Sequence, residues 1–213
     1  MKVIVILIFL ACLFSCNQNK KESKKLIVSA INLLVSYNTA HPVLHTKQDT
    51  DKRNTIYGKA KGLLNKAIKI DSKSPGPYIL KIMLFRSIQQ HDSALTIAKQ
   101  MYKLWPRSPI TNIYTGRTYE EIGDTISSKL YFNNALLFYN KLLGEKNKDA
   151  EIFKYINVET DRAILFIMLN QQQKGESILN KLYTKEKDTL KKASILKYIG
   201  KTKKEILAED IWY

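Results

Sequence analysis

Apolar residues recur every three or four positions along most of the chain, which is the spacing of one face of an α-helix. The first such stripe predicts a helix over about 22–37, and the second predicts one over 55–70. Between them, residues 38–54 are polar, contain Pro42 and show no sustained period, so a loop is expected there. The pattern indicates an all-α protein.

From Pro75 to about Leu142 the pattern of small and bulky residues repeats after 34 positions. Ala94, Ala98 and Met101 of the first copy match Ser128, Phe132 and Ala135 of the second. Each copy is expected to form two helices, over about 76–89 and 92–104 and then over 109–122 and 125–142. A fixed period of this length is typical of stacked helical repeats, in which each unit buries its apolar face against the next.

The second copy reads Gly116-x-x-Tyr119-x-x-x-Gly123-Asp124, followed by Ser128-x-x-x-Phe132-x-x-Ala135. This resembles a tetratricopeptide repeat, in which a small residue and an aromatic on one helix pack against small residues on the next. The resemblance implies a short right-handed α-solenoid of about three helical hairpins, with regular repeats at 75–108 and 109–142 and a degenerate repeat before them.

The remaining C-terminal part predicts one further hairpin and a cap. Residues 150–169 carry Ala163 and Phe166 in the small and aromatic positions, and Gly175 begins the matching second helix, with the phase displaced by 13 residues. A last amphipathic stretch, 189–207, has many lysines on its outer side and is expected to be the polar-faced capping helix that solenoid ends need.

The N-terminal residues have the layout of a secretory signal. Met1-Lys2 supplies one positive charge, and Val3–Phe14 then gives 12 apolar residues without a charge. A membrane-spanning helix needs about 20 such residues, so this run is typical of a signal-peptide core instead.

The residues after this run, Leu13-Phe14-Ser15-Cys16, resemble the lipobox of bacterial lipoproteins, although Phe14 replaces the usual small residue. The resemblance implies cleavage before Cys16 and acylation of that cysteine, with 1–15 as signal peptide, 16–25 as polar tether and 26–213 as the helical domain. Each buried CH₂ of an acyl chain contributes about 0.8 kcal/mol, so two or three chains anchor firmly. The alternative is an ordinary cleaved signal with a free Cys16. By analogy with Gram-negative sorting, Asn17 indicates the outer membrane, with the domain facing the periplasm or the exterior.

Basic residues exceed acidic ones by 16, but 30 of the 35 basic residues are Lys. Recognition of phosphates and base edges favours the bidentate fork of Arg, so this excess indicates a solvated basic surface and no nucleic-acid partner.

No set of residues in the sequence nominates an enzyme, a cofactor or a metal site. There is no Gly-rich phosphate loop, no Gly-x-Ser-x-Gly and no His-Glu-x-x-His. His41 and His45 have a metal-like spacing, but Pro42 argues against a helix there and no third ligand accompanies them. Glu120 and Glu121 diverge by about 100° on a helix, so they cannot act on one bond. Loss of Cys12 with the signal leaves Cys16 as the last cysteine, which excludes a disulfide framework.

In the tetratricopeptide family, defined positions of the first helix of each repeat line a concave groove that receives a peptide. Carried onto this sequence, these positions are Ile79, Met83 and Arg86 in the first copy and Ile113, Arg117 and Glu120 in the second. Apolar side chains mixed with arginines suit an acidic peptide. The alternative is that some of these residues pack against the chain's own terminal helix.

The expected function is therefore binding: a membrane-anchored adaptor or assembly factor that holds another envelope protein in its groove. One alternative is an immunity protein that neutralises a toxin, since such inhibitors often present a strongly charged surface. Another is a glycan-binding lipoprotein, for which Trp105 and Trp212 would be the indole platforms.

Overall fold

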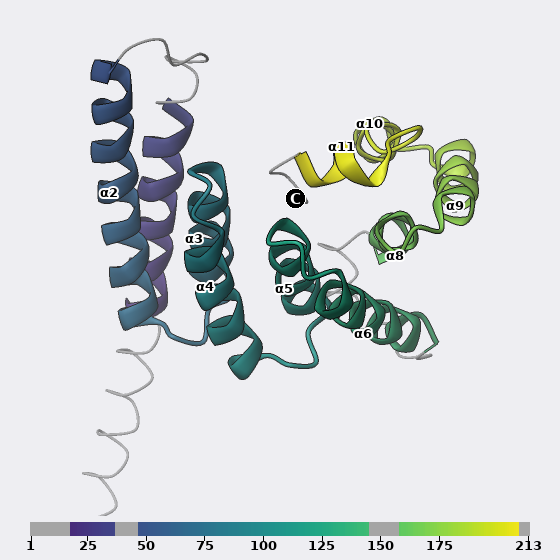
Figure 1. Ribbon diagram of the computed structural model, residues 1–213, viewed down its shortest axis with the longest axis horizontal. Coiled ribbons are helices and arrows are strands. Elements are labelled where there is room, and N and C mark those ends of the chain that lie inside the picture. The colour runs from purple at the N-terminus through teal and green to yellow at the C-terminus, as the bar shows by residue number, and fades with distance from the viewer. Residues whose placement is uncertain (1–17, 37–46, 145–157, 209–213) are drawn as a thin grey trace, which may run out of the picture. The chain divides into compact units, whose positions relative to one another are not determined.

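The computed structural model describes residues 18–36, 47–144 and 158–208 (Figure 1). Within these ranges the chain is all-helical, as predicted, and its helices pack in antiparallel pairs. The chain divides into two compact units, residues 1–97 and 98–213, whose boundary falls inside α4 (His91–Leu104). Each unit has a hydrophobic core of its own.

In the first unit, residues 18–36 form a helix that lies along α2 (Lys47–Ile70), as Figure 1 shows. The hydroxyl of Ser23 donates to the carbonyl oxygen of Ala67 at 3.3 Å, and Ala30 is fully buried in one cluster with side chains of α2. Residues 18–25 of the predicted tether thus belong to a packed helix, because Ser23 is only 1% exposed.

The helix α2 begins at Lys47, so the predicted loop over 38–54 is wrong for residues 47–54. Asp51, Lys52 and Asn54 are exposed, and this end of the helix shows no apolar period because residues 47–54 include no apolar side chain. The rest of the predicted loop, with His41 and His45, lies outside the described residues.

Three helical hairpins share one turn geometry. Their helices are α3 (Gly76–Ser87) with α4, α5 (Pro109–Glu121) with α6 (Thr125–Gly144), and α8 (Val158–Met168) with α9 (Gln172–Lys185). The turn residue has a positive φ in every case, 57° at Gln89, 83° at Gly123 and 62° at Asn170. The amide of the next residue donates five positions back, from Gln90 to Phe85, from Asp124 to Tyr119 and from Gln171 to Phe166. This is the Schellman arrangement that ends a helix by satisfying its last carbonyls.

These turns follow the period of the sequence. Gln89 and Gly123 are 34 residues apart, and Asn170 follows Gly123 after 47, which is 34 plus the predicted displacement of 13. A small buried residue comes five positions after each turn residue: Ala94, Ser128 and Gly175. The predicted helices of all three hairpins are therefore confirmed within the described residues, while residues 150–157 lie outside them.

Close approach of the paired helices explains why these positions are small. A Cβ atom built on Gly116 would lie 2.8 Å from the ring of Phe132, and one on Gly175 would lie 2.6 Å from the carbonyl oxygen of Ala163. At both contacts the neighbouring helix occupies the space that a side chain would need, so only glycine fits without a shift.

The predicted capping helix over 189–207 is wrong as a single helix, because it is two: α10 (Thr189–Leu196) and α11 (Lys203–Ala208). Gly200 between them has a φ of 78°. Thr202 and Glu205 then form a capping box, in which the Thr202 amide donates to Oε2 of Glu205 at 2.8 Å and the Glu205 amide donates to Oγ1 of Thr202 at 3.3 Å. The glycine turn and the capping box therefore divide residues 189–207 into two helices, although the apolar spacing runs through the whole stretch.

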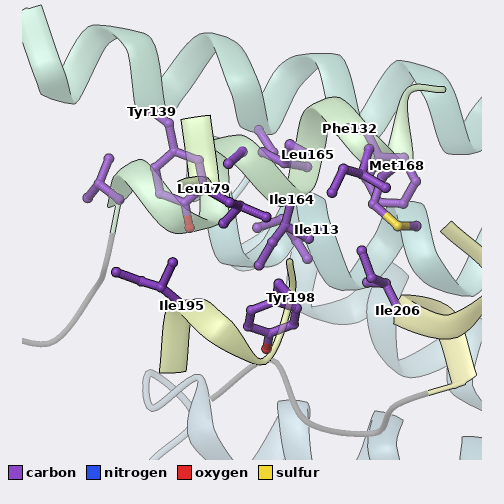
Figure 2. Close-up of a cluster of buried hydrophobic side chains, with 14 residues drawn as sticks. Ile113, Phe132, Tyr139, Ile164, Leu165, Met168, Leu179, Ile195, Tyr198 and Ile206 are labelled. Atoms are coloured by element: carbon purple, nitrogen blue, oxygen red, sulfur yellow. The ribbon is translucent and has the colours of Figure 1, made fainter. Parts of the chain in front are cut away.

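The core of the second unit joins α5, α6, α8 and α9 to the terminal helices (Figure 2). Residues 163–168 of α8 are buried all round, which places this helix at the centre of the unit. Side chains from the other elements surround it, among them Ile113, Phe132, Tyr139, Leu179, Ile195, Tyr198 and Ile206.

Replacing a glycine inside a helix by alanine usually stabilises a protein, but the close contact at Gly175 should make this replacement destabilising. We expect Gly175→Ala to destabilise the protein by about 1–3 kcal/mol, because the added methyl group meets a backbone carbonyl that cannot move away. Gly62→Ala in α2 is the matched control, since nothing lies within 4 Å of its Cβ position. It should stabilise the protein by about 1 kcal/mol. Urea unfolding followed by circular dichroism measures both changes, and equal signs would contradict the close packing of α8 on α9.

Candidate functional site

The predicted groove residues of the first repeat lie on α3 in the first unit. Ile79 and Met83 are partly buried, and Arg86 is only 7% exposed. The predicted residues of the second repeat lie on α5, in the other unit. The two sets are thus held by different compact units of the chain.

On α5 the predicted groove positions are covered by the C-terminal helix α11. Ile113 and Arg117 have no exposed surface, and Nη2 of Arg117 donates to the carbonyl oxygen of Leu207 at 3.1 Å. Glu120 forms an ion pair with Lys203 at 2.5 Å, with both side chains less than one fifth exposed. A partner therefore reaches Arg117 only if α11 moves away, as the alternative of packing against the terminal helix anticipated.

Arg117 belongs to a buried polar cluster. The hydroxyl of Tyr139 donates to Oδ2 of Asp161 at 2.8 Å, inside the core. Burial raises the pKa of the Tyr198 phenol, the charge of Lys197 lowers it, and the charges of Asp161 and Arg117 act on it in opposite directions. Arg117, Asp161 and Tyr198 are thus near enough to interact electrostatically, and Tyr139 hydrogen-bonds the carboxylate of Asp161. This cluster ties α5, α6 and α8 to the segment that leads into α11.

Next to this cluster is an open hollow of about 480 Å³, which we call the basic pocket. It is lined by Glu120, Thr125, Lys129, Asn170, Lys203, Lys204 and Leu207. These residues come from the end of α5, the first turns of α6, the turn after α8, and α11.

Local capping interactions position the walls of the basic pocket. Asp124 begins α6 by accepting hydrogen bonds from the amide of Ser127 at 2.9 Å and from its hydroxyl at 2.7 Å. These bonds, led by the one from the amide, hold the pKa of Asp124 below its ordinary value. Asn170, whose φ is positive, lines the pocket from the turn after α8, and the capping box of Thr202 and Glu205 begins α11, which lines it as well.

The basic pocket carries three lysines against one glutamate, a net charge of +2. Hydroxyl and amide donors from Thr125 and Asn170 accompany them. Such a lining can attract and hydrogen-bond an anionic group. Among the predicted groove residues, the pocket includes Glu120 alone. Nothing in the sequence distinguishes Lys129 or Lys204 from the other lysines, so sequence reasoning missed them.

Beside the pocket, α6 exposes an apolar stripe made of Ile126, Leu130 and Leu137, with 84%, 58% and 62% of their surfaces open. At about 100° per residue, these three positions lie within an arc of about 40° on the helix. Lys129 is offset from this stripe by about 60°, so the stripe and the pocket wall are adjacent faces of one helix.

In the part of the chain that the structure covers, no group of three or more His, Cys, Asp and Glu side chains is placed to hold a metal ion. None of the described helices combines the length and apolar character of a membrane span. Cys16 and Trp212 lie outside the described residues, and Trp105 is partly buried.

No protein-family model matches this chain, and a search of curated proteins finds no match.

Removing the buried guanidinium should loosen α11. We expect Arg117→Met to destabilise the protein by about 1–3 kcal/mol, because the carbonyl oxygen of Leu207 loses its donor. The loss of the bond to Leu207 should also speed tryptic cleavage at Lys203 and Lys204. Arg107→Met is the control, since Arg107 is exposed and its loss should change stability by less than about 0.5 kcal/mol. Equal stability and equal cleavage rates for the two variants would contradict the role of Arg117 in holding α11.

Proposed function

We propose that this chain is a lipid-anchored protein-binding adaptor or assembly factor of a bacterial cell envelope, built from tetratricopeptide-like repeats. The observation that carries the proposal is the threefold repetition of one helical hairpin. Its turns recur at Gln89, Gly123 and Asn170 with the same hydrogen bonds and the same small residue after them.

Repetition of this kind favours a short solenoid. Each hairpin has too small an interior to be stable alone, so neighbours stack and leave extended surfaces for a partner. The contacts of α6 with α8 join the second and third hairpins in this way. The apolar stripe of α6 adds exposed apolar surface of the kind that marks binding sites.

The proposed anchor is Cys16, on the resemblance of residues 13–16 to a lipobox. Acyl chains on this cysteine would hold the helical units at a membrane surface, where an adaptor meets other envelope proteins.

A toxin-neutralising role is the second candidate, favoured by the formal net charge of +16, which would attract an acidic toxin.

The anchor is tested by changing one residue. We expect Cys16→Ala to abolish incorporation of labelled palmitate and to move the protein out of the detergent phase on phase partitioning. Ser15→Ala, which keeps a small residue before the cysteine, is the control and should still be acylated. Persistent labelling and detergent partitioning of Cys16→Ala would refute the lipid anchor.

The binding role is tested with a photo-crosslinking amino acid placed at Leu130 or Leu137 of the full chain, in the cells that naturally produce it. Both positions are exposed on α6 and should give the same discrete adduct, identified by mass spectrometry. The same amino acid at Lys181, exposed on α9, should not give it. A secreted toxin in the adduct would select the second candidate. Absence of an adduct at both α6 positions, or identical adducts at Lys181, would count against binding through this face.

A further inference from the structure

We infer that the basic pocket binds carboxylate side chains of an acidic protein segment whose apolar residues lie on the adjacent stripe of α6. The inference rests on the proposed protein-binding function and names the chemistry of the partner. It also moves the binding site from the α5 positions of the predicted groove, which α11 covers, to the edge formed by α6 and α11.

The charges of the pocket favour an anion. The ion pair with Glu120 compensates the charge of Lys203, so the excess positive charge belongs to Lys129 and Lys204. Both of these side chains are exposed, on α6 and α11 respectively, and they line the same hollow. Two ammonium groups held by separate helices can each pair with a carboxylate of one acidic segment.

The openness of the pocket favours a segment of a larger molecule over a small ligand. Thr125, Lys129, Asn170 and Lys204 are all exposed, whereas small-molecule sites bury about 70–90% of their ligand. A protein segment that rests in such a hollow gains further contact area beside it. The stripe of Ile126, Leu130 and Leu137 provides that area over about 17 Å of helix length.

The combination of charge and apolar surface favours a polypeptide. A nucleic acid would offer phosphates to the lysines, but its bases stack on aromatic side chains and the stripe is aliphatic. No arginine lines the pocket to make bidentate phosphate contacts. A peptide that combines Glu or Asp with Leu or Ile matches both surfaces. Electrostatic complementarity of this kind sets partner choice and the rate of association.

The probe is a short fluorescent peptide in which glutamates are interspersed with leucines, and it is titrated by anisotropy into the full chain held in neutral detergent micelles. We expect saturable binding that weakens as salt rises, because exposed charges are screened. Replacing the glutamates of the peptide by glutamine, or its leucines by serine, should weaken binding about tenfold in either case.

Matched variants locate the site. Lys129→Glu with Lys204→Glu should weaken binding of the peptide by at least about tenfold, since both cations of the pocket are reversed. Lys181→Glu with Lys191→Glu makes the same change in net charge at exposed positions outside the pocket and should leave binding nearly unchanged. Circular dichroism of both variants should match the wild type.

Each other result overturns the inference. Equal weakening by both double variants would mean attraction by net charge alone. Tighter binding to phosphatidylserine vesicles than to the peptide, with the same loss in Lys129→Glu/Lys204→Glu, would assign the pocket to a membrane surface. No saturable binding of the peptide would remove the acidic segment as ligand. In that case a discrete photo-crosslinked adduct at Leu130 or Leu137 in cells would still support the proposed binding function. Failure of the acidic ligand and failure of the binding function can therefore be told apart.

Discussion

The second unit depends on a guanidinium that has no contact with solvent. Arginine keeps its charge inside proteins, so the burial of Arg117 requires acceptors and a compensating anion in the core. The carbonyl oxygen of Leu207 supplies one acceptor, and Asp161 supplies negative charge near the same phenol of Tyr198. Because Leu207 belongs to α11, the requirement of one buried charge keeps the C-terminal helix on α5.

This constraint also decides where a partner can bind. With α11 seated on α5, Ile113 and Arg117 are interior residues, and Glu120 pairs with Lys203 of the covering helix. The same helix brings Lys204 next to the hollow that Lys129 of α6 lines, which creates a basic pocket that α5 and α6 alone would lack. By covering the predicted groove positions of α5, α11 thus forms a different surface, the basic pocket, beside the exposed apolar residues of α6.

Prediction from the sequence succeeded where the same local pattern of turn and small residues recurs along the chain. The hairpin turns at Gln89 and Gly123 follow the period of 34, and the Schellman bonds that close them depend on residues within six positions of each other. It failed at residues 47–54, where the helix has no apolar residue and therefore shows no period. It also failed between α10 and α11, although the capping box of Thr202 and Glu205 was readable. Of the residues that line the basic pocket, the repeat pattern of the sequence predicted Glu120 as a binding residue, but it did not predict its ion-pair partner Lys203.

By itself, the sequence determined the helical class, the pairing of neighbouring helices and the small residues where they touch, because each follows from periodicity and residue size along a short stretch of chain. Only the tertiary structure decided that Arg117 is buried, that α11 covers α5, and that Lys129 and Lys204 line one hollow. These facts join residues up to 90 positions apart. Contacts at such separation depend on how whole helices pack, and no local pattern of apolar and polar residues records which surfaces will meet.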